Sequence, residues 1–230
     1  IKITFNVLEY CRANNLPIIF ASSREVYGDV HHMLPEKTAV REGIADFVLT
    51  ESPYSASKIA GEALVHSYSR CYGIPYLIFR FSNVYGRYDS DIERMERVIP
   101  LFINRILHDE PITIYGRNKT LDFTHVDDTV QGLVKGIDAL TSKRITNQTF
   151  NLACGKGYTL EEMALFIASA LGKKIEPTFA DVRPGEINYY VADITAAQEK
   201  LGFAPTTTLE EGIKKAIAWQ FEYNQKKRPQ

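Results

Sequence analysis

Helical and strand-like segments alternate along the first third of the sequence, and this order limits the possible folds more than any other feature. Hydrophobic residues recur at helical spacing within residues 1–14, and a continuous apolar run of strand length follows at residues 16–21. The order repeats with a helical segment at 54–72 and a β-rich run at 75–81. Short, fully apolar runs are typical of strands buried on both faces. The alternation therefore predicts an α/β fold with a parallel sheet covered by helices.

The remaining two thirds of the chain are less regular. Further helices are expected at residues 93–107, 126–140, 159–171, 193–201 and 209–221, and strands at 111–115 and 149–153. Thr124 and Asp127 are spaced like a capping pair for the helix at 126–140. The buried positions expected in the helix at 54–72 are Ala56, Ile59, Ala60, Ala63, Leu64 and Tyr68. No repeat or low-complexity tract interrupts the sequence, so the whole chain is expected to fold.

Composition and charge exclude several classes of protein. The 230 residues are 45% hydrophobic, enough for a sizeable core, and the formal net charge of -1 argues against a general nucleic-acid binder. The longest apolar runs are far too short to cross a membrane, and no basic leader with a hydrophobic region stands at the start. We therefore expect a cytoplasmic protein with no nucleic-acid or membrane partner.

The cysteines and histidines argue against disulfides and metal sites. Cys11, Cys71 and Cys154 are odd in number, far apart and in no Cys-x-x-Cys pair, so each is expected to be a reduced, buried thiol. None of the five histidines belongs to a cluster with the spacing of a zinc site. The sequence predicts no metal.

Tyr54 and Lys58 form a candidate catalytic pair. They are four residues apart, so they lie on one face of the expected helix. A free phenol ionises near pH ~10, and a neighbouring ammonium group favours the phenolate that a general base requires. The spacing alone is weak evidence, because Tyr115 and Lys119, and Tyr223 and Lys227, repeat it.

Context distinguishes the first pair from the other two. Tyr54 stands at the start of a helix, in the run Ser-Pro-Tyr-Ser-Ala-Ser-Lys, and Ser22 and Ser23 directly follow the apolar strand that precedes this helix. The carboxyl ends of parallel strands are where ligands bind in open α/β sheets. A serine there can hydrogen-bond the substrate hydroxyl that a tyrosinate deprotonates. Without such a serine, a helix-start tyrosine beside a surface lysine would be the better interpretation.

Five segments, in this order, resemble motifs of the extended short-chain dehydrogenases that act on nucleotide sugars, of the UDP-glucose 4-epimerase type. The segments are Ser22–Gly28, Ser52–Lys58, Arg80–Gly86, Leu121–Asp128, and Arg183–Glu186 followed by Asp193 and Leu201–Pro205. The resemblance runs from end to end of the chain. It implies a Rossmann-like sheet with helices on both faces, a smaller C-terminal substrate-binding lobe, and NAD as cofactor.

The resemblance also implies roles for individual residues. Ser23, Tyr54 and Lys58 correspond to the catalytic set, and Tyr54, Lys58 and Ser22 to cofactor contacts. The residues that correspond to contacts with the nucleotide-sugar substrate are Ser23, Glu25, Asn83 and Arg183. An arginine offers phosphate a bidentate fork, and asparagine offers a neutral amide donor. Asn83 has an alternative role as a turn residue at the strand end.

The same resemblance implies a division of the chain and an assembly. Residues 1–85 correspond to the C-terminal half of the NAD-binding domain, joined by residues 124–155. Residues 86–123 and 156–230 correspond to the sugar-nucleotide-binding lobe. The helices at 1–14 and 54–72 resemble those that relatives pair across a two-fold axis, which predicts a homodimer.

Three departures from the family pattern limit the interpretation. None of the 14 glycines forms a Gly-rich phosphate loop, so about three βα units of ~30 residues are expected to be missing. Arg24 stands where dehydratases carry an acid, and an arginine cannot donate a proton at neutral pH. Leu121 stands where relatives often carry a phosphate-binding arginine. The chain is therefore expected to be a fragment, or a natural short form completed by another chain.

Three functions remain open. The first is epimerisation of a UDP-hexose, in the manner of UDP-glucose 4-epimerase, through a transient 4-keto sugar with Tyr54 as the base. The second is decarboxylation of a UDP-uronate, or dehydration of a nucleotide sugar, with Glu25 active after the keto sugar forms. The third is a non-catalytic scaffold or interaction module that does not bind the cofactor.

Overall fold

The computed structural model describes residues 1–28, 38–42, 52–89, 97–182 and 187–227, with side chains described as far as residue 223. Among these residues, no helix is both long and apolar enough to span a membrane.

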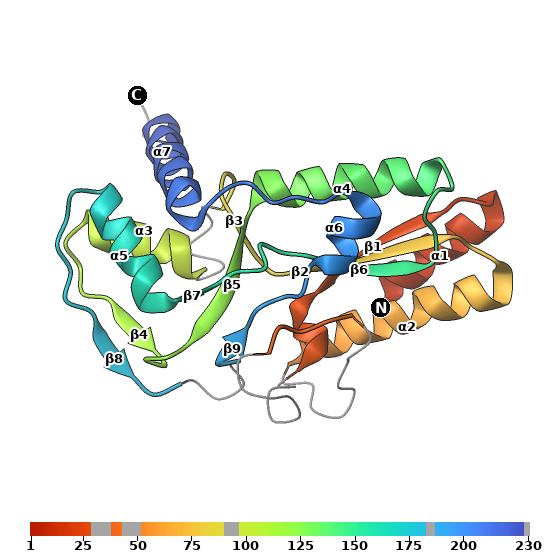
Figure 1. Ribbon diagram of the computed structural model, residues 1–230, viewed down its shortest axis with the longest axis horizontal. Helices are drawn as coiled ribbons and strands as arrows, with labels where there is room; N and C mark the ends of the chain where they lie inside the picture. Colours follow the sequence, from red (N-terminus) through yellow and green to blue (C-terminus); the bar gives the residue numbers. More distant parts are fainter. Residues whose placement is uncertain (29–37, 43–51, 90–96, 183–186, 228–230) are drawn as a thin grey trace.

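A three-stranded parallel sheet organises one end of the molecule (Figure 1). Its strands, in order, are β1 (Ile18–Ser23), β2 (Tyr76–Phe81) and β6 (Gln148–Leu152). Ser22 is in register with Arg80, and Arg80 with Asn151, so three polar residues lie side by side near the carboxyl end of the sheet. The parallel order confirms the predicted α/β fold.

Helices cover both faces of this sheet. They are α1 (Lys2–Asn14) and α2 (Pro53–Tyr72) on one face, and α4 (Val126–Thr141) and α6 (Thr195–Leu201) on the other. Successive residues of β2 face opposite layers: Ile78 packs in the cluster with α1 and α2, whereas Leu77 and Phe79 pack in the cluster with α4 and α6. This two-sided burial explains the continuous apolar runs at residues 16–21 and 75–79 of the sequence.

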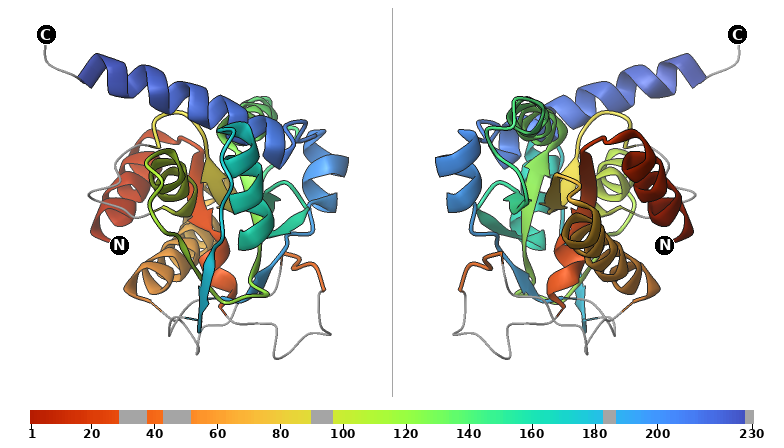
Figure 2. Two further views of the ribbon diagram at one scale, coloured as in Figure 1. Left: turned by 90° about the vertical axis from the view of Figure 1, so that its left-hand side faces the viewer. Right: turned by 90° about the vertical axis from the view of Figure 1, so that its right-hand side faces the viewer.

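A second group of elements forms the other end of the molecule. Its strands are β3 (Asn83–Tyr85), β4 (Thr113–Tyr115), β5 (Thr120–His125), β7 (Gly157–Thr159), β8 (Thr178–Ala180) and β9 (Tyr189–Tyr190). Its helices are α3 (Val98–Leu107), α5 (Leu160–Ala170) and α7 (Leu209–Lys227). β5 pairs with β3 and β9 in parallel and with β7 in antiparallel fashion. Figure 2 shows α7 projecting from the body of the molecule towards the C-terminus.

Most predicted elements are present, with shifts at their ends. The strand expected at 16–21 runs over Ile18–Ser23, so both serines belong to it. The helix expected at 93–107 begins at Val98 in the described residues, and α7 continues to Lys227 rather than ending at residue 221. Residues 193–201, grouped with the lobe in the sequence analysis, contribute α6, which packs on the three-stranded sheet through Ala197 and Leu201.

Local sequence fixes the ends of α2, the helix that carries Tyr54 and Lys58. Ser52 caps its N-terminus in a reciprocal capping box with Ser55, and Pro53 occupies the first turn, where its missing N–H needs no partner. Gly73 ends the helix in the left-handed conformation at a φ of 69°. The start of the helix, and hence the place of Tyr54, is strongly determined.

The buried face of α2 differs from the prediction. Ala56 and Ala63 are exposed, while Val65, Gly61 and Glu62 are buried. A Cβ on Gly61 would lie 2.3 Å from Cζ of Phe20, so the helix approaches β1 through its only glycine. Apolar periodicity could not identify this face, because a glycine and a glutamate occupy its centre.

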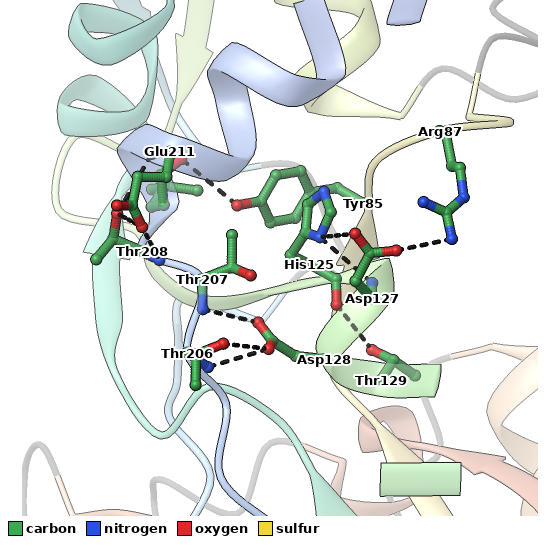
Figure 3. Close-up of polar contacts among 11 residues, drawn as sticks. Tyr85, Arg87, His125, Asp127, Asp128, Thr129, Thr206, Thr207, Thr208 and Glu211 are labelled. Atoms are coloured by element: carbon green, nitrogen blue, oxygen red, sulfur yellow. Dashed lines mark hydrogen bonds and ion pairs between the residues drawn. The ribbon is translucent and has the colours of Figure 1, made fainter. Parts of the chain in front are cut away.

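Figure 3 shows the polar contacts at the start of α4. His125, not Thr124, caps the helix: its side chain accepts a hydrogen bond from the backbone N–H of Asp127. The predicted capping pair is therefore wrong by one residue. Asp128 accepts hydrogen bonds from Thr206 and Thr207, which holds the segment leading into α7 against α4.

Of the three cysteines, none of which forms a disulfide, only one matches the prediction of burial. Cys11 is buried, Cys154 is half-buried and Cys71 is exposed. Cys71 lies in the last turn of α2, beyond the part of the helix that packs on the sheet.

Candidate active site

A pocket of about 330 Å³ lies where β1 and β2 end. It brings together four of the predicted site residues: Ser23, Glu25, Tyr54 and Asn83. Arg24, Asp89, Arg97 and Phe123 also contribute to its lining. Residues far apart in the sequence therefore meet at the sheet edge where α/β folds bind ligands.

Lys58 lies about one helical turn after Tyr54 on α2. Its Nζ is 5.4 Å from the centre of the Tyr54 ring and donates a 2.8 Å hydrogen bond to the carbonyl oxygen of Ala21 in β1. This bond ties the helix to the strand that carries Ser23. Tyr54 itself lines the pocket and is 53% exposed, so its side chain is accessible from solvent.

The two neighbouring serines of β1 differ in what their side chains contact. Ser23 lines the pocket, and its Oγ accepts a hydrogen bond from the backbone N–H of Glu25, which starts the short 3-10 helix η1 (Arg24–Tyr27). The Ser22 hydroxyl instead donates a 2.5 Å hydrogen bond to Glu62 in the interior, and Ser22 is 3% exposed. Its side chain therefore lies away from the pocket, although the sequence analysis placed it at the cofactor.

A buried polar network lies behind the pocket, and the sequence analysis missed it. Arg80 forms a bidentate pair with Glu62, with Nη2 to Oε2 at 2.7 Å and Nε to Oε1 at 3.0 Å. The guanidinium of Arg80 lies 4.7 Å from the centre of the Tyr27 ring, and the Tyr27 hydroxyl donates to Asn151 at 2.6 Å. Glu62 follows Lys58 by four residues on α2, and this spacing was the available signal.

Arg24 and Glu25 form an ion pair at the pocket wall. Nη2 of Arg24 is 2.9 Å from Oε1 of Glu25, and their side chains are 14% and 26% exposed. The guanidinium also lies 5.5 Å from the centre of the Tyr190 ring. Nη1 of Arg24 and the hydroxyl of Tyr190 are both buried, and neither has a hydrogen-bond partner in the described part of the chain.

Asn83 and Arg97 also line this pocket. The Asn83 amide donates a 2.9 Å hydrogen bond to the carbonyl oxygen of Asp122, so it joins β3 to β5 while lining the pocket. Arg97, just before α3, donates to the carbonyl oxygen of Val84 and pairs with Asp89 at 3.4 Å. Burial raises the pKa of Asp89, and Arg97 opposes this effect. The sequence analysis gave Arg97 no role.

The remaining predicted positions contribute less. Arg183 lies outside the described residues. Leu121 is 6% exposed and belongs to the hydrophobic core, as expected for a residue that has no charge to present to a phosphate. A larger, open hollow of about 780 Å³ lies between the turn at 116–119 and residues 179–182, but none of the catalytic candidates is among its described lining residues. We therefore assign the chemistry to the smaller pocket.

The chain is also similar to known proteins in sequence and in structure. A sequence profile described as the NAD dependent epimerase/dehydratase family matches residues 1–153. A putative UDP-glucose 4-epimerase of Methanocaldococcus jannaschii is 34% identical, with 96% of this chain and 68% of that protein aligned. The chain belongs to the NAD dependent epimerase/dehydratase family.

Two solved structures of related epimerases have the same fold. The UDP-glucose 4-epimerase of Thermotoga maritima, with UDP-glucose, matches with a TM-score of 0.85 and 27% identity over 96% of this chain and 69% of that one. The UDP-glucuronic acid 4-epimerase of Bacillus cereus, in complex with UDP-glucuronic acid and NAD, matches with a TM-score of 0.83 and 28% identity over 97% and 67%. The chain spans about two thirds of the length of these relatives.

Family membership implies NAD, and the described residues fit one end of it. The Tyr54 ring, the Lys58 ammonium group and the Ser23 hydroxyl lie at the carboxyl end of β1, where the reacting end of a dinucleotide would meet a sugar. The other end requires a strand, a Gly-rich turn and a helix N-terminus, and no stretch of this sequence has that glycine pattern. β1 is an edge strand in the described part of the chain, with β2 on one side of it. The described residues therefore fit the reacting end of the cofactor.

Asp122 differs from the other buried acids near the site. Its carboxylate accepts hydrogen bonds from the backbone N–H groups of Cys154, Gly155 and Ala192, at 3.0, 2.9 and 3.3 Å. None of these three donors is cationic. Burial raises its pKa to about 6, although these hydrogen bonds oppose the shift. The described residues include no group of three His, Cys, Asp or Glu side chains that could hold a metal ion.

Proposed function

We propose that this chain carries the catalytic and sugar-binding part of an NAD-dependent enzyme that epimerises a UDP-hexose at C4. The observation that carries the proposal is the meeting of Ser23, Tyr54 and Asn83 in one pocket, with Lys58 bonded to β1 beneath Tyr54. UDP as the nucleotide is taken from relatives whose names state UDP-sugars.

The residues act in a defined order in this proposal. Tyr54, beside the Lys58 ammonium group, accepts the proton of the C4 hydroxyl, and Ser23 holds that hydroxyl by a hydrogen bond. NAD, when bound, supplies the redox chemistry by which the 4-keto sugar forms and is reduced again. Tyr54 then returns the proton to oxygen after the sugar has presented its other face. Asn83 and Arg97, which also line the pocket, hold the phosphate side of the substrate.

A second activity is favoured by Glu25 alone. It lies in the pocket with Ser23 and Tyr54, so it could act on a 4-keto uronate during decarboxylation. Dehydration is disfavoured because it needs both an acid and a base. Arg24 stands where the second acid would be, and it pairs with the Glu25 carboxylate. Release of carbon dioxide from a UDP-uronate would support decarboxylation over epimerisation.

The proposal includes an assembly and a division into two parts. We infer that residues 1–85 and 124–155 build the NAD side, with α6 packed on it, and that residues 86–123 and the rest of 156–230 build the sugar side.

We also infer a homodimer through α1 and α2. It is supported by exposed apolar residues on α1, namely Ile3, Phe5, Val7 and Tyr10. A monomeric mass in solution at micromolar concentration would overturn the homodimer. Three cysteines without a disulfide fit a cytoplasmic location.

The first experiment is to unfold the purified chain and assay the supernatant for NAD and NADH, then to titrate the folded chain with NAD and with UDP-glucose. The proposal expects UDP-glucose binding that is weakened in the Asn83→Ala variant. Stoichiometric nicotinamide, with conversion of UDP-glucose to UDP-galactose, would establish an active epimerase. Binding of neither the nucleotide sugar nor NAD would overturn the proposal in favour of a non-catalytic scaffold.

A further inference from the structure

One ion pair in the lining of the candidate pocket joins Asp89 to Arg97. Nε of Arg97 lies 3.4 Å from Oδ1 of Asp89, and both residues line the pocket. Arg97 is one of the two residues that the proposed function assigns to the phosphate side of the substrate. Its anionic partner, Asp89, has no role in that proposal, although it has the same charge as a phosphate and shares the same arginine.

The contacts described for Arg97 engage two of the three nitrogens of its guanidinium group. Nε faces Asp89, and Nη1 donates a 3.2 Å hydrogen bond to the carbonyl oxygen of Val84 in β3. An arginine binds phosphate best when two neighbouring nitrogens donate to it in parallel. A phosphate that binds the edge formed by Nε and Nη2 therefore has to displace the Asp89 carboxylate.

The Asp89 carboxylate depends on Arg97 for its counter-charge. Its side chain is 17% exposed, against 48% for Arg97, so the carboxylate is the less solvated member of the pair. Burial raises the pKa of Asp89, and Arg97 opposes this effect because a nearby cation favours the charged form. A phosphate at Arg97 would take away this counter-charge and place a second anion beside Asp89. The two anions thus compete for one cation.

A neighbouring hollow offers the displaced carboxylate a place. This hollow, of about 220 Å³, shares Asp89 and Arg97 with the candidate pocket, and Arg87 also lines it. Arg87 is half-exposed and pairs with Asp127 through Nη2 at 2.8 Å, as Figure 3 shows. A carboxylate that leaves Arg97 can enter this hollow, where Arg87 supplies another cation.

We propose that Asp89 is a place-holder for the substrate diphosphate: its carboxylate occupies Arg97 until a phosphate displaces it, and it thereby lowers the affinity of the chain for nucleotides. The inference rests on the proposed function, since it assumes that Arg97 holds the phosphate side of a nucleotide sugar. It adds to that function a pocket residue that opposes binding. Because substrate and product share the diphosphate, both are held less tightly than Arg97 alone would hold them.

The test is a double-mutant cycle on UDP binding. UDP is titrated by calorimetry into the wild-type chain, Asp89→Asn, Arg97→Gln and the double variant. We expect Asp89→Asn to bind UDP about 5-fold more tightly than the wild-type chain, which is the strength of a partly exposed ion pair expressed as an affinity ratio. In the Arg97→Gln background the same substitution should change the affinity less than ~2-fold, because no guanidinium remains for Asp89 to occupy.

Asp109→Asn is the matched control. It removes the same charge and one ion pair, to Lys173, just beyond the C-terminal end of α3, whereas Arg97 precedes the N-terminal end of that helix. Its UDP affinity should equal the wild-type value. Thermal denaturation checks that each variant is folded, and Asp89→Ser, which also removes the charge, replaces Asp89→Asn if that variant does not fold.

The outcomes separate this inference from the proposed function. Tighter UDP binding by Asp89→Asn that disappears in the double variant supports the place-holder. An unchanged or weaker affinity, the same gain with and without Arg97, or an equal gain in Asp109→Asn would overturn it and leave the proposed function intact. If Arg97→Gln binds UDP as tightly as the wild-type chain, Arg97 does not hold the phosphate side, and the place-holder is overturned with that assignment. No binding of UDP by the wild-type chain or by any variant would overturn both the inference and the proposed function.

Discussion

Ser22 and Ser23 are neighbours in β1, yet their hydroxyl groups belong to two different environments. The Ser22 hydroxyl enters a buried network in which Glu62, Arg80, Tyr27 and Asn151 are hydrogen-bonded or stacked. The Ser23 hydroxyl enters the pocket, where Tyr54 is half exposed and Arg24 has an unpaired nitrogen among the described residues. Alternation of side chains along a strand places consecutive residues on opposite faces, so one strand end serves both environments.

The difference shows how the site is held and why it remains reactive. On the buried side, Glu62 binds the strand that carries the serines and Arg80 binds Glu62, so the positions of α2 and β1 are fixed together. On the pocket side, polar groups remain free to meet a ligand. Rigidity behind the pocket preorganises the groups in front of it. Substitutions on the two sides should therefore affect different measurements.

The largest expected effect on stability comes from Glu62→Ala. The substitution breaks the buried ion pair between Glu62 and Arg80, and breaking such a pair typically costs ~3–5 kcal/mol. Chemical denaturation should show this loss as a lower midpoint. The control, Glu210→Ala, removes an exposed partner of Lys214 and should leave the midpoint unchanged. Equal midpoints for Glu62→Ala and the wild-type chain would contradict the role given to the network.

Tyr54→Phe should show the opposite pattern, with an effect on chemistry and none on stability. The Tyr54 side chain is 53% exposed and makes no buried hydrogen bond among the described contacts. The melting temperature of the Tyr54→Phe variant should therefore match the wild-type value. Epimerisation by the NAD-loaded protein should fall about 10²–10⁴-fold, the usual contribution of a general base. A rate within a factor of ten of the wild-type rate would exclude Tyr54 as the base.

The two serines give the most direct test of the comparison. Ser22→Ala should lower the free energy of unfolding by ~1.5–3 kcal/mol, because its hydroxyl donates to a buried carboxylate. Ser23→Ala should lower it by only about 1 kcal/mol, the value of a single cap, while weakening turnover. Denaturation curves and steady-state rates on both variants decide the matter. If the two substitutions lower stability equally, the division between the sides is wrong.

A fourth expected effect concerns the pH dependence of stability, through a buried carboxylate that has no counter-ion among the described residues. The pKa of Asp122 is raised to about 6 in the folded protein, against ~3.9 for an unfolded chain. Between these values the folded state binds more protons than the unfolded state, so the contribution of Asp122 to stability falls as pH rises from about 4 to 6. A denaturation series across this range on the wild-type chain and on Asp122→Asn, which cannot titrate, isolates the slope. Equal slopes would show that Asp122 does not titrate there.

Sequence patterns predicted the sheet and helices well, because apolar runs and helical spacing report burial directly. They also placed Ser23, Glu25, Tyr54 and Asn83 in what the structure shows to be one pocket. They failed where burial depends on a partner distant in the sequence. In the sequence alone, Glu62 resembles an exposed helix residue, and only the structure shows that Arg80 pairs with it. Similarly, the guanidinium of Arg24 lies over the ring of Tyr190, which is remote in the sequence. The capping error at α4 arose because the preferred N-cap residues are Ser, Thr, Asp and Asn, whereas His125 caps this helix.

Gly61 has a consequence for anyone who wishes to redesign this site. It lies three residues after Lys58, at the point where α2 comes closest to Phe20, and any larger side chain there would meet the aromatic ring. Either the Phe20 ring or the helix would have to move, and a shift of the helix would take Tyr54 and Lys58 with it and lengthen the bond to Ala21. Substitutions of the pocket wall at Arg24, Arg97 or Ile99 do not disturb this contact, whereas a larger residue at position 61 puts the placement of the catalytic pair at risk.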